Sequence, residues 1–218
     1  MSVHALRNRI VDGPDSVGAR RRARRWEWLR AAFPQIENMS VIDLGGTAES
    51  WQRAPVRPAR VHVVNLEHEA DADLPSWLRA DQGDACNLPP AILGSSYDLV
   101  FSNSVIEHVG GHAQRQRFAE AVHKLADRHW VQTPYRYFPI EPHWLFPGFQ
   151  FLPMSARAQI SYRWPLAHTR SASVDDGLAE AMSVELLSRA EMSYYFPHAE
   201  IQAERLLGAV KSLIAVRR

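Results

Sequence analysis

The sequence is poor in cysteine and lacks long apolar runs. Cys86 is the only cysteine in 218 residues, which excludes an internal disulfide and any zinc site built from several cysteines. No uninterrupted apolar stretch approaches the roughly 18 residues that suggest a membrane span, and the first residues lack the apolar core of a secretion signal. We therefore expect a soluble, cytoplasmic protein without a membrane span.

The chain also lacks a large charge excess. Its net charge is +1, although five arginines fall between residues 20 and 25. Just after this run, apolar residues recur at helical spacing: Trp26, Leu29, Ala32 and Phe33. This pattern predicts an amphipathic helix over 16–33, preceded by a mobile arm over 1–15. Arginines around such a stripe normally form its solvated face. We therefore expect no nucleic-acid partner, and phosphate binding by the run is the weaker alternative.

Strand and helix patterns alternate along most of the chain. At 46% apolar content the chain is large enough for one α/β domain. Apolar and β-branched runs predict strands over 40–43, 61–65, 78–80, 97–101 and 129–132. Helical patterns predict helices over 49–53 and 113–125. This alternation predicts a mostly parallel sheet covered on both faces, with ligands at the carboxyl ends of its strands.

One of those strands ends in a glycine turn, Val41-Ile42-Asp43-Leu44-Gly45-Gly46-Thr47. Glycine has no Cβ, so a ligand can approach the backbone there, and a helix that starts just afterward offers unpaired N–H groups. A ligand is therefore expected above Gly45 and Gly46. A single motif of this kind is weak, and an ordinary strand-to-helix turn is the alternative.

Two capping-box patterns predict helix starts. Ser104 with Glu107 predicts a short helix after the strand over 97–101, and Ser188 with Glu191 predicts a second helix. After another helix over 174–182, the chain ends in strands over 199–204 and 212–216, which predict an antiparallel hairpin at the sheet edge.

Aromatic residues and prolines crowd residues 134–172. Long connections of this kind often form lids or substrate-binding segments, so we expect an aromatic cover over a pocket. An aromatic minor core or a dimer contact is equally compatible with the pattern. A homodimer through this segment is therefore a further expectation.

Four ordered motifs together resemble those of class I methyltransferases that use S-adenosylmethionine. They are Asp43-Leu44-Gly45-Gly46, Asn65-Leu66-Glu67, Gly83-Asp84-Ala85, and the segment from Asp98 to Val109. The order and spacing of four motifs are more specific than any one of them. The segment from Thr133 to His143 also resembles an uncharacterised, notably actinobacterial, subfamily of type 11-like methyltransferases.

The resemblance implies an α/β, Rossmann-like class I methyltransferase fold. Its seven-stranded, mostly parallel sheet has helices on both faces and a terminal antiparallel hairpin. It divides the chain into an N-terminal arm with a basic amphipathic helix (1–36), an S-adenosylmethionine-binding core (37–134), an aromatic, Pro-rich lid or substrate segment (135–172), and C-terminal helices with the closing hairpin (173–218).

The resemblance also assigns the cofactor-binding residues. Gly45 and Gly46 would lie under the amino-acid portion of S-adenosyl-L-methionine, with Asp43 ordering the loop. Asn65 stands where the family usually has an acid for the ribose hydroxyls, so Asn65 or Glu67 would bind them. Asp84 would accept from the adenine amino group, and the Ala85 backbone would lie beside the adenine ring. Asn103 would contact the methionine end.

Transfer to an alcohol needs a base, and histidine is the usual one. His108 is our first candidate, with Glu107 beside it to hold an acceptor hydroxyl, and His143 is the second, oriented by Glu141. Helix capping by Glu107 and a histidine satisfied within its loop are the alternatives. These residues also offer a divalent metal site, which no ligand spacing requires.

The predicted activity is O-methylation of a small molecule, a sugar or an apolar metabolite. N- or C-methylation is the alternative within enzymes, and a non-catalytic protein that binds S-adenosylmethionine is the alternative from another class. RNA or protein methylation is less favoured, because no Asn-Pro-Pro-Tyr-type motif follows the strand over 97–101.

Overall fold

The computed structural model describes residues 16–67 and 73–218, so the predicted arm over 1–15 lies outside the described residues. The strands are β1 (Ser40–Leu44), β2 (Arg60–Asn65), β3 (Leu78–Gln82), β4 (Leu99–Asn103), β5 (His129–Pro134), β6 (Ile140–Glu141), β7 (Phe146–Pro147), β8 (Glu200–Leu206) and β9 (Ala209–Arg217). The helices are α2 (Val17–Ala32), η2 (Ile36–Asn38), α3 (Ala48–Gln52), α4 (Pro90–Leu93), α5 (His112–Leu125), η3 (Phe149–Phe151), α6 (Met154–Arg163), α7 (Val174–Ser183) and α8 (Arg189–Tyr195).

Seven strands form one sheet in the order β3-β2-β1-β4-β5-β9-β8. The strands from β3 to β5 are parallel, and β9 runs antiparallel to both β5 and β8. The predicted fold class is confirmed, including the closing hairpin at the sheet edge. Because Asp43 pairs with both Val63 and Phe101, the carboxyl ends of β1, β2 and β4 meet at one rim.

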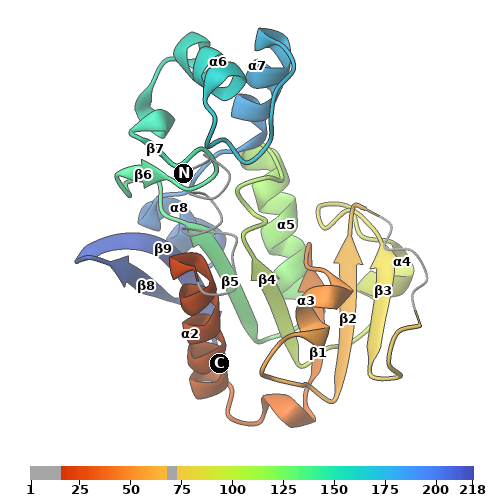
Figure 1. Cartoon of the computed structure of the whole chain (residues 1–218). Helices are drawn as coiled ribbons and strands as arrows, with labels where there is room; N and C mark the ends of the chain where they lie inside the picture. The colour runs from red at the N-terminus through yellow and green to blue at the C-terminus, as the bar shows by residue number, and fades with distance from the viewer. Residues whose placement is uncertain (1–15, 68–72) are drawn as a thin grey trace.

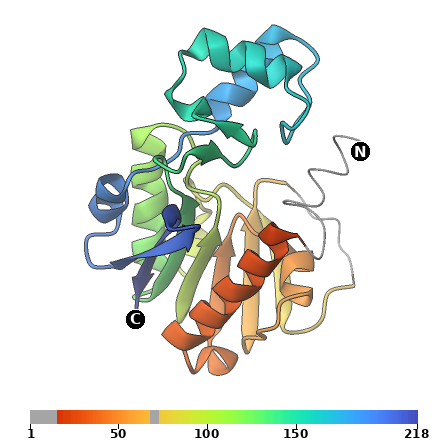
Figure 2. The same cartoon turned by 60° about the vertical axis from the view of Figure 1, so that its left-hand side comes forward.

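Helices cover both faces of this sheet (Figures 1 and 2). On one face, Leu29 of α2 and Trp51 of α3 are buried against apolar strand residues. On the other face, Phe118 and Val122 of α5 pack with Met192 of α8. Leu29 belongs to the stripe that the helical periodicity predicts for the helix over 16–33. Among the described helices, none is long and apolar enough to cross a membrane.

The two capping-box patterns have different outcomes. Ser188 and Glu191 form the reciprocal capping box that starts α8, as predicted. The predicted helix at Ser104 is wrong, because residues 104–111 form turns. Ser104 has a left-handed φ of 59°, whereas an N-cap residue normally has extended backbone. Its hydroxyl donates to the Gln132 side chain at 3.0 Å and does not cap a helix. Since no helix starts here, Glu107 has no capping role.

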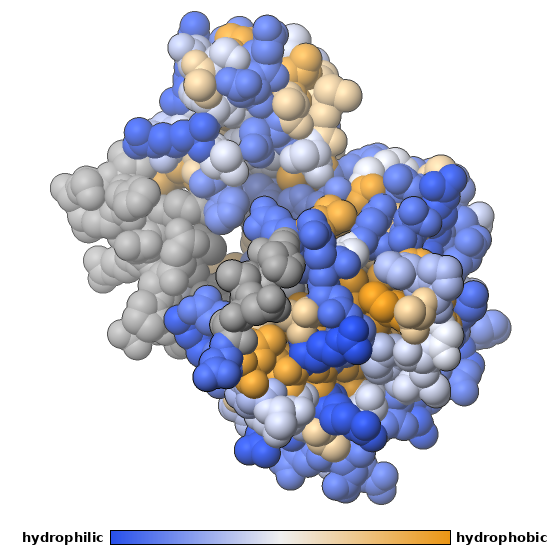
Figure 3. Space-filling view, turned by 90° about the vertical axis from the view of Figure 1, so that its right-hand side faces the viewer, coloured by the Kyte–Doolittle hydropathy of each residue, from blue (hydrophilic) through white to orange (hydrophobic). Residues whose placement is uncertain are grey.

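Residues 135–187 form a small lobe above the carboxyl rim (Figures 1 and 2). Trp144 and Phe149 stack with ring centroids 4.0 Å apart, within a cluster that includes Ala167 and Ala181. This is the aromatic minor core that the sequence left as an alternative. The space-filling view shows the lobe set apart from the body (Figure 3). On the body, the same view shows apolar surface bordered by hydrophilic residues.

The lobe is more regular than the sequence indicates. It contains α6, which the aromatic and proline pattern did not predict. A Cβ added to Gly177 of α7 would lie 2.5 Å from the Ala158 carbonyl oxygen of α6, so the two helices pack closely. α7 therefore belongs to this lobe together with α6.

Candidate functional site

The structure brings the predicted cofactor residues to one rim of the sheet. They lie at or just after the carboxyl ends of β1, β2, β3 and β4, which are neighbours in the sheet. Ligands of open α/β sheets bind at such rims. In chain order the residues are Asp43, Gly45, Gly46, Asn65, Glu67, Asp84, Ala85 and Asn103.

The turn after β1 requires glycine at both positions. Gly45 has a φ of 85°, and a Cβ there would lie 2.5 Å from a methyl of Val105. A Cβ on Gly46 would lie 1.9 Å from Oδ2 of Asp43. The same oxygen accepts a 2.6 Å hydrogen bond from Nε1–H of Trp51, so the buried Asp43 ties the turn to α3.

Asn65 supports this turn from the neighbouring strand. Its Nδ2 donates to the Gly46 carbonyl at 2.8 Å, and its Oδ1 accepts from the backbone N–H of Glu67 at 3.2 Å. The amide that the sequence assigned to the ribose therefore binds the protein backbone. Glu67 is exposed at the same rim.

The loop after β3 is ordered by Asp84. Its Oδ1 accepts from the backbone N–H of Cys86 at 2.8 Å, and Ala85 is buried beside it. Burial raises the pKa of the Cys86 thiol to about 11, so this cysteine is not a reactive thiolate at neutral pH.

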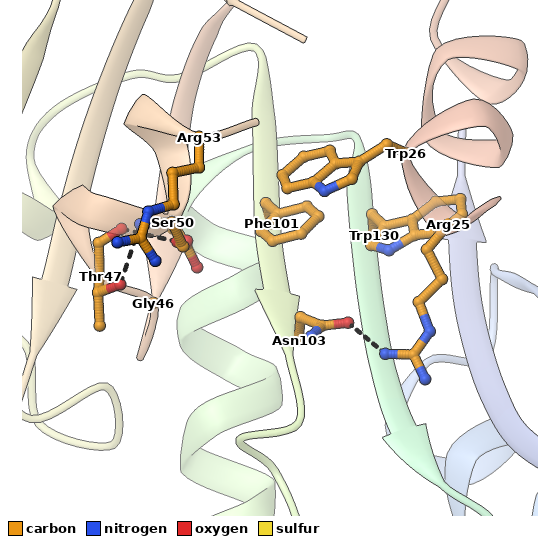
Figure 4. Close-up of a pocket in the computed structure, with 10 residues that line it drawn as sticks. Arg25, Trp26, Gly46, Thr47, Ser50, Arg53, Phe101, Asn103 and Trp130 are labelled. Carbon is orange, nitrogen blue, oxygen red and sulfur yellow. Dashed lines mark hydrogen bonds between the residues drawn. The ribbon is translucent and has the colours of Figure 1, made fainter. Parts of the chain in front are cut away.

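A cavity of about 440 Å³ opens beside the glycine turn, within the size range of small-molecule sites. Figure 4 shows side chains of α2 and α3 on opposite sides of Phe101 and Asn103. Trp26 of α2 stacks on Phe101, with centroids 5.5 Å apart and planes 6° apart. The lining residues are Arg25, Trp26, Asp43, Gly46, Thr47, Ser50, Arg53, Phe101, Asn103 and Trp130.

Arg25 is a site residue that the sequence reasoning missed. The prediction that the arginine run is solvated is wrong here, because the Arg25 side chain is 13% exposed and pairs with the buried Glu204 at 2.9 Å. Its Nη1 also donates to Asn103 at 3.1 Å and to Gln132 at 2.9 Å. The side chain of the adjacent Arg24 is exposed, as predicted. No local signal distinguishes the two arginines.

A second group of predicted residues converges above β4 and β5. Nε2 of His108 lies 3.1 Å from Nε2 of His143, which the lobe supplies. Nδ1 of His143 lies 2.7 Å from Oε1 of Glu141, whose side chain is 1% exposed. Glu107 is fully buried, and its Oε2 accepts from the Thr133 hydroxyl at 2.9 Å. The sequence candidates Glu107, His108 and His143 therefore form one cluster.

Burial changes the titration of this cluster. It raises the pKa of Glu107 to about 7. His108 keeps exposed surface, but partial burial and the neighbouring His143 lower its pKa to about 4, while the Ser183 backbone acts in the opposite direction. His108 is therefore neutral at neutral pH. Two further histidines lie nearby: Nδ1 of His112 is 2.9 Å from the Tyr195 hydroxyl, and the backbone N–H of His168 donates to the His143 carbonyl.

A second cavity, of about 520 Å³, is lined by residues of the lobe. Its lining combines the aromatic rings of Trp144 and Phe149 with charged groups that include Arg136 and Arg157. Glu141 lines it as well and contacts His143, so this cavity adjoins the histidine cluster.

No family model and no curated protein matches the sequence. An S-adenosylmethionine-dependent methyltransferase from Mesorhizobium loti is similar in structure, with a TM-score of 0.56 and 16% identity, over 88% of this chain and 97% of that one. Magnesium protoporphyrin IX methyltransferase from Synechocystis PCC 6803, solved with SAH bound, has a TM-score of 0.54 and 14% identity, over 93% of this chain and 84% of that one. The N-terminal domain of EvdMO1, solved with SAH and D-fucose, has a TM-score of 0.52 and 15% identity, over 90% of this chain and 82% of that one.

At these identities the similarity shows the fold alone. The chain has the Rossmann-like fold of class I methyltransferases, with the same kind of sheet and closing hairpin that its own strand order displays.

Proposed function

We propose that this protein transfers a methyl group from S-adenosylmethionine to an oxygen of a small molecule. The observation that carries the proposal is the cavity between the glycine turn and Asn103, within a class I methyltransferase fold. Membership of the type 11-like, actinobacterial subfamily is part of the same proposal and rests on the resemblance of residues 133–143.

The cofactor would lie along the rim in one direction. Its amino-acid portion rests on Gly45 and Gly46, and the sulfonium lies near Asn103, whose side chain Arg25 holds. The adenine extends toward Asp84 and Ala85. We assign the ribose hydroxyls to Glu67, because the Asn65 amide donates to the Gly46 carbonyl.

The acceptor would enter from the lobe side of the rim. The cavity that contains Trp144 and Phe149 combines aromatic faces with charged groups, which suits a sugar or another ring that carries hydroxyls. Glu141 lines this cavity and contacts His143, which supports an acceptor hydroxyl near the histidine cluster.

Methyl transfer is an in-line displacement in which the acceptor oxygen bonds to the methyl carbon as the carbon–sulfur bond breaks. The products are a methyl ether and S-adenosylhomocysteine, and the hydroxyl proton passes to a base. We assign that base to the pair His108 and His143, where Glu141 stabilises the imidazolium that forms. General-base catalysis of this kind contributes about 10²- to 10⁴-fold.

Calorimetry with S-adenosylmethionine and S-adenosylhomocysteine tests the cofactor assignment. We expect both to bind, and Asp84→Ala to weaken both. Strong binding of NAD without binding of either sulfur compound would overturn it. Release of S-adenosylhomocysteine with a panel of hydroxylated sugars and ring compounds then identifies the acceptor class.

The histidine assignment is tested with an acceptor in hand. His108→Gln and His143→Gln should each lower kcat more than they raise KM. If both variants methylate the acceptor at the wild-type rate, the base assignment fails, and N- or C-methylation becomes the better description. Cofactor binding without turnover of any acceptor would favour the non-catalytic alternative.

A further inference from the structure

Three donor atoms converge near the ends of β4 and β5. Glu107, His108 and His143 each offer one, and all three lie within 4.8 Å of one another. Donors around a tetrahedral zinc ion, each about 2.0–2.2 Å from the metal, lie about 3.3–3.6 Å apart. The 3.1 Å between the two Nε2 atoms is already close to that spacing. Small side-chain movements therefore suffice to surround a cation.

Glu107 carries an oxygen that the protein leaves unpaired. Its side chain is fully buried, and Oε2 accepts from Thr133, whereas Oε1 has no hydrogen-bond partner among the described residues. A buried carboxylate oxygen without a partner is unfavourable, and a cation beside it removes the cost.

Glu141 fixes the orientation of the His143 ring. Its carboxylate accepts from Nδ1 and from the backbone N–H of His143, both at 2.7 Å, and from the backbone N–H of Trp144 at 2.9 Å. Because a carboxylate only accepts, Nδ1 carries the proton and Nε2 of the neutral ring keeps its lone pair. A histidine that binds a metal is commonly held in this way through its other nitrogen.

We propose that Glu107, His108 and His143 bind one divalent transition-metal cation such as Zn²⁺, with Glu141 and Thr133 as outer partners. Two imidazoles and one carboxylate are a donor set of catalytic zinc sites, which keep a position open for an added oxygen. Mg²⁺ prefers oxygen ligands and retains its waters, so it fits this set poorly.

The role of the cation in catalysis rests on the proposed function, whereas its binding does not. An acceptor hydroxyl at the open position ionises more readily and releases its proton to water. The resulting alkoxide attacks the sulfonium methyl group. In this metal-bound state the two histidines act as ligands, and the base of the metal-free state is not needed.

Metal binding is measured on the whole, untagged chain, freed of metal with a chelator and exchanged into chelator-free buffer. Calorimetry with Zn²⁺ and visible absorption with Co²⁺ should both give one site per chain, and Mg²⁺ should give none. Glu107→Gln, His108→Gln and His143→Gln should each weaken binding at least about tenfold. Glu141→Gln should weaken it about 10- to 100-fold and shift the Co²⁺ absorption band, since the ring it positions is a ligand.

His198→Gln is the matched control, because His198 is exposed and lies outside the cluster. It should bind Zn²⁺ as the wild type does. His108 is exposed too, so His108→Gln should fold, and thermal unfolding checks this.

The absence of a stoichiometric Zn²⁺ site, or equal affinity in His108→Gln and the wild type, overturns the metal proposal. These titrations need neither cofactor nor acceptor. If the protein binds Zn²⁺ but not S-adenosylmethionine, the metal proposal stands and the proposed function fails. If it binds S-adenosylmethionine but not Zn²⁺, the metal proposal fails and the proposed function stands.

Discussion

The guanidinium of Arg25 lies 2.9 Å from the carboxylate of Glu204 and so joins α2 to the edge strand β8. Burial is the largest influence and acts to raise the pKa of Glu204, but the charge and hydrogen bonds of Arg25, with smaller contributions from Lys211 and Ser212, together lower it. The Arg25→Met variant leaves this carboxylate without its counter-charge. We expect the free energy of unfolding at pH 7, measured with urea, to fall by about 3 kcal/mol.

The neighbouring Arg24 provides the control for this experiment. Arg24→Met removes an exposed charge from the same helix and should change stability by no more than about 0.5 kcal/mol. Equal effects of the two substitutions would contradict the assigned role of the buried ion pair.

The glycine turn gives a second prediction. Gly46→Ala places a methyl against the Asp43 carboxylate, and the turn must move to accommodate it. We expect calorimetry to show at least about tenfold weaker binding of S-adenosylhomocysteine. Gly111→Ala is the matched substitution, because among the described residues no atom beyond its chain neighbours lies within 4 Å of the added Cβ. A similar loss in both variants would argue against a specific role for the turn.

His129 predicts how stability depends on pH. It is fully buried, both ring nitrogens lack partners among the described residues, and burial lowers its pKa from 6.5 to about 3. Between these values the unfolded chain binds the proton more tightly. The free energy of unfolding should therefore fall as pH drops from 6.5 toward 3, by up to about 1.4 kcal/mol per pH unit.

The His129→Leu variant tests this assignment, because leucine removes both the titration and the unpaired nitrogens. At pH 7 its stability should match or exceed that of the wild type by up to about 1 kcal/mol. Below pH 6 its urea midpoint should decline less steeply. The exposed His198→Gln substitution should leave the acid profile unchanged, and an identical profile for His129→Leu would show that another group is responsible.

Packing in the lobe gives a fourth prediction. In Gly177→Ala the new methyl meets the Ala158 carbonyl oxygen and, at 3.0 Å, the Tyr162 backbone nitrogen. This clash should outweigh the gain in helix propensity and destabilise the lobe by roughly 1–3 kcal/mol. Hydrogen exchange should show faster exchange over 154–183 and unchanged protection in β1 and β5. Uniform loss of protection would mean that the lobe and sheet unfold together.

Local patterns predicted the central strands well, because β1, β2 and β4 are mostly apolar runs that end in polar or glycine residues. They were insufficient where a distant residue decides the outcome. Ser188 and Ser104 both precede a glutamate by three residues, yet only Ser188 caps a helix. The Ser104 hydroxyl instead donates to the Gln132 side chain, and the Glu107 carboxylate accepts from the Thr133 hydroxyl. Both partners come from β5, which no local rule could place.

The candidate site divides in the same way. The glycine turn and the residues at the strand ends were found because sequence order fixes their place along the rim. Glu107, His108 and His143 were found as residue types, but the 3.1 Å approach of the two rings depends on how the lobe folds over the sheet. Arg25 was missed because its partner, Glu204, is distant in sequence.

The lobe leaves and rejoins the core at adjacent points. Tyr135 and Leu187 form an isolated β-bridge, and the N–H of Arg136 donates to the Leu187 carbonyl at 2.9 Å. An insertion with neighbouring ends can change in length and sequence without disturbing the register of the strands beneath it. Under the proposed function, such a cassette lets evolution, or an engineer, exchange the acceptor cavity while the proposed cofactor site stays as it is.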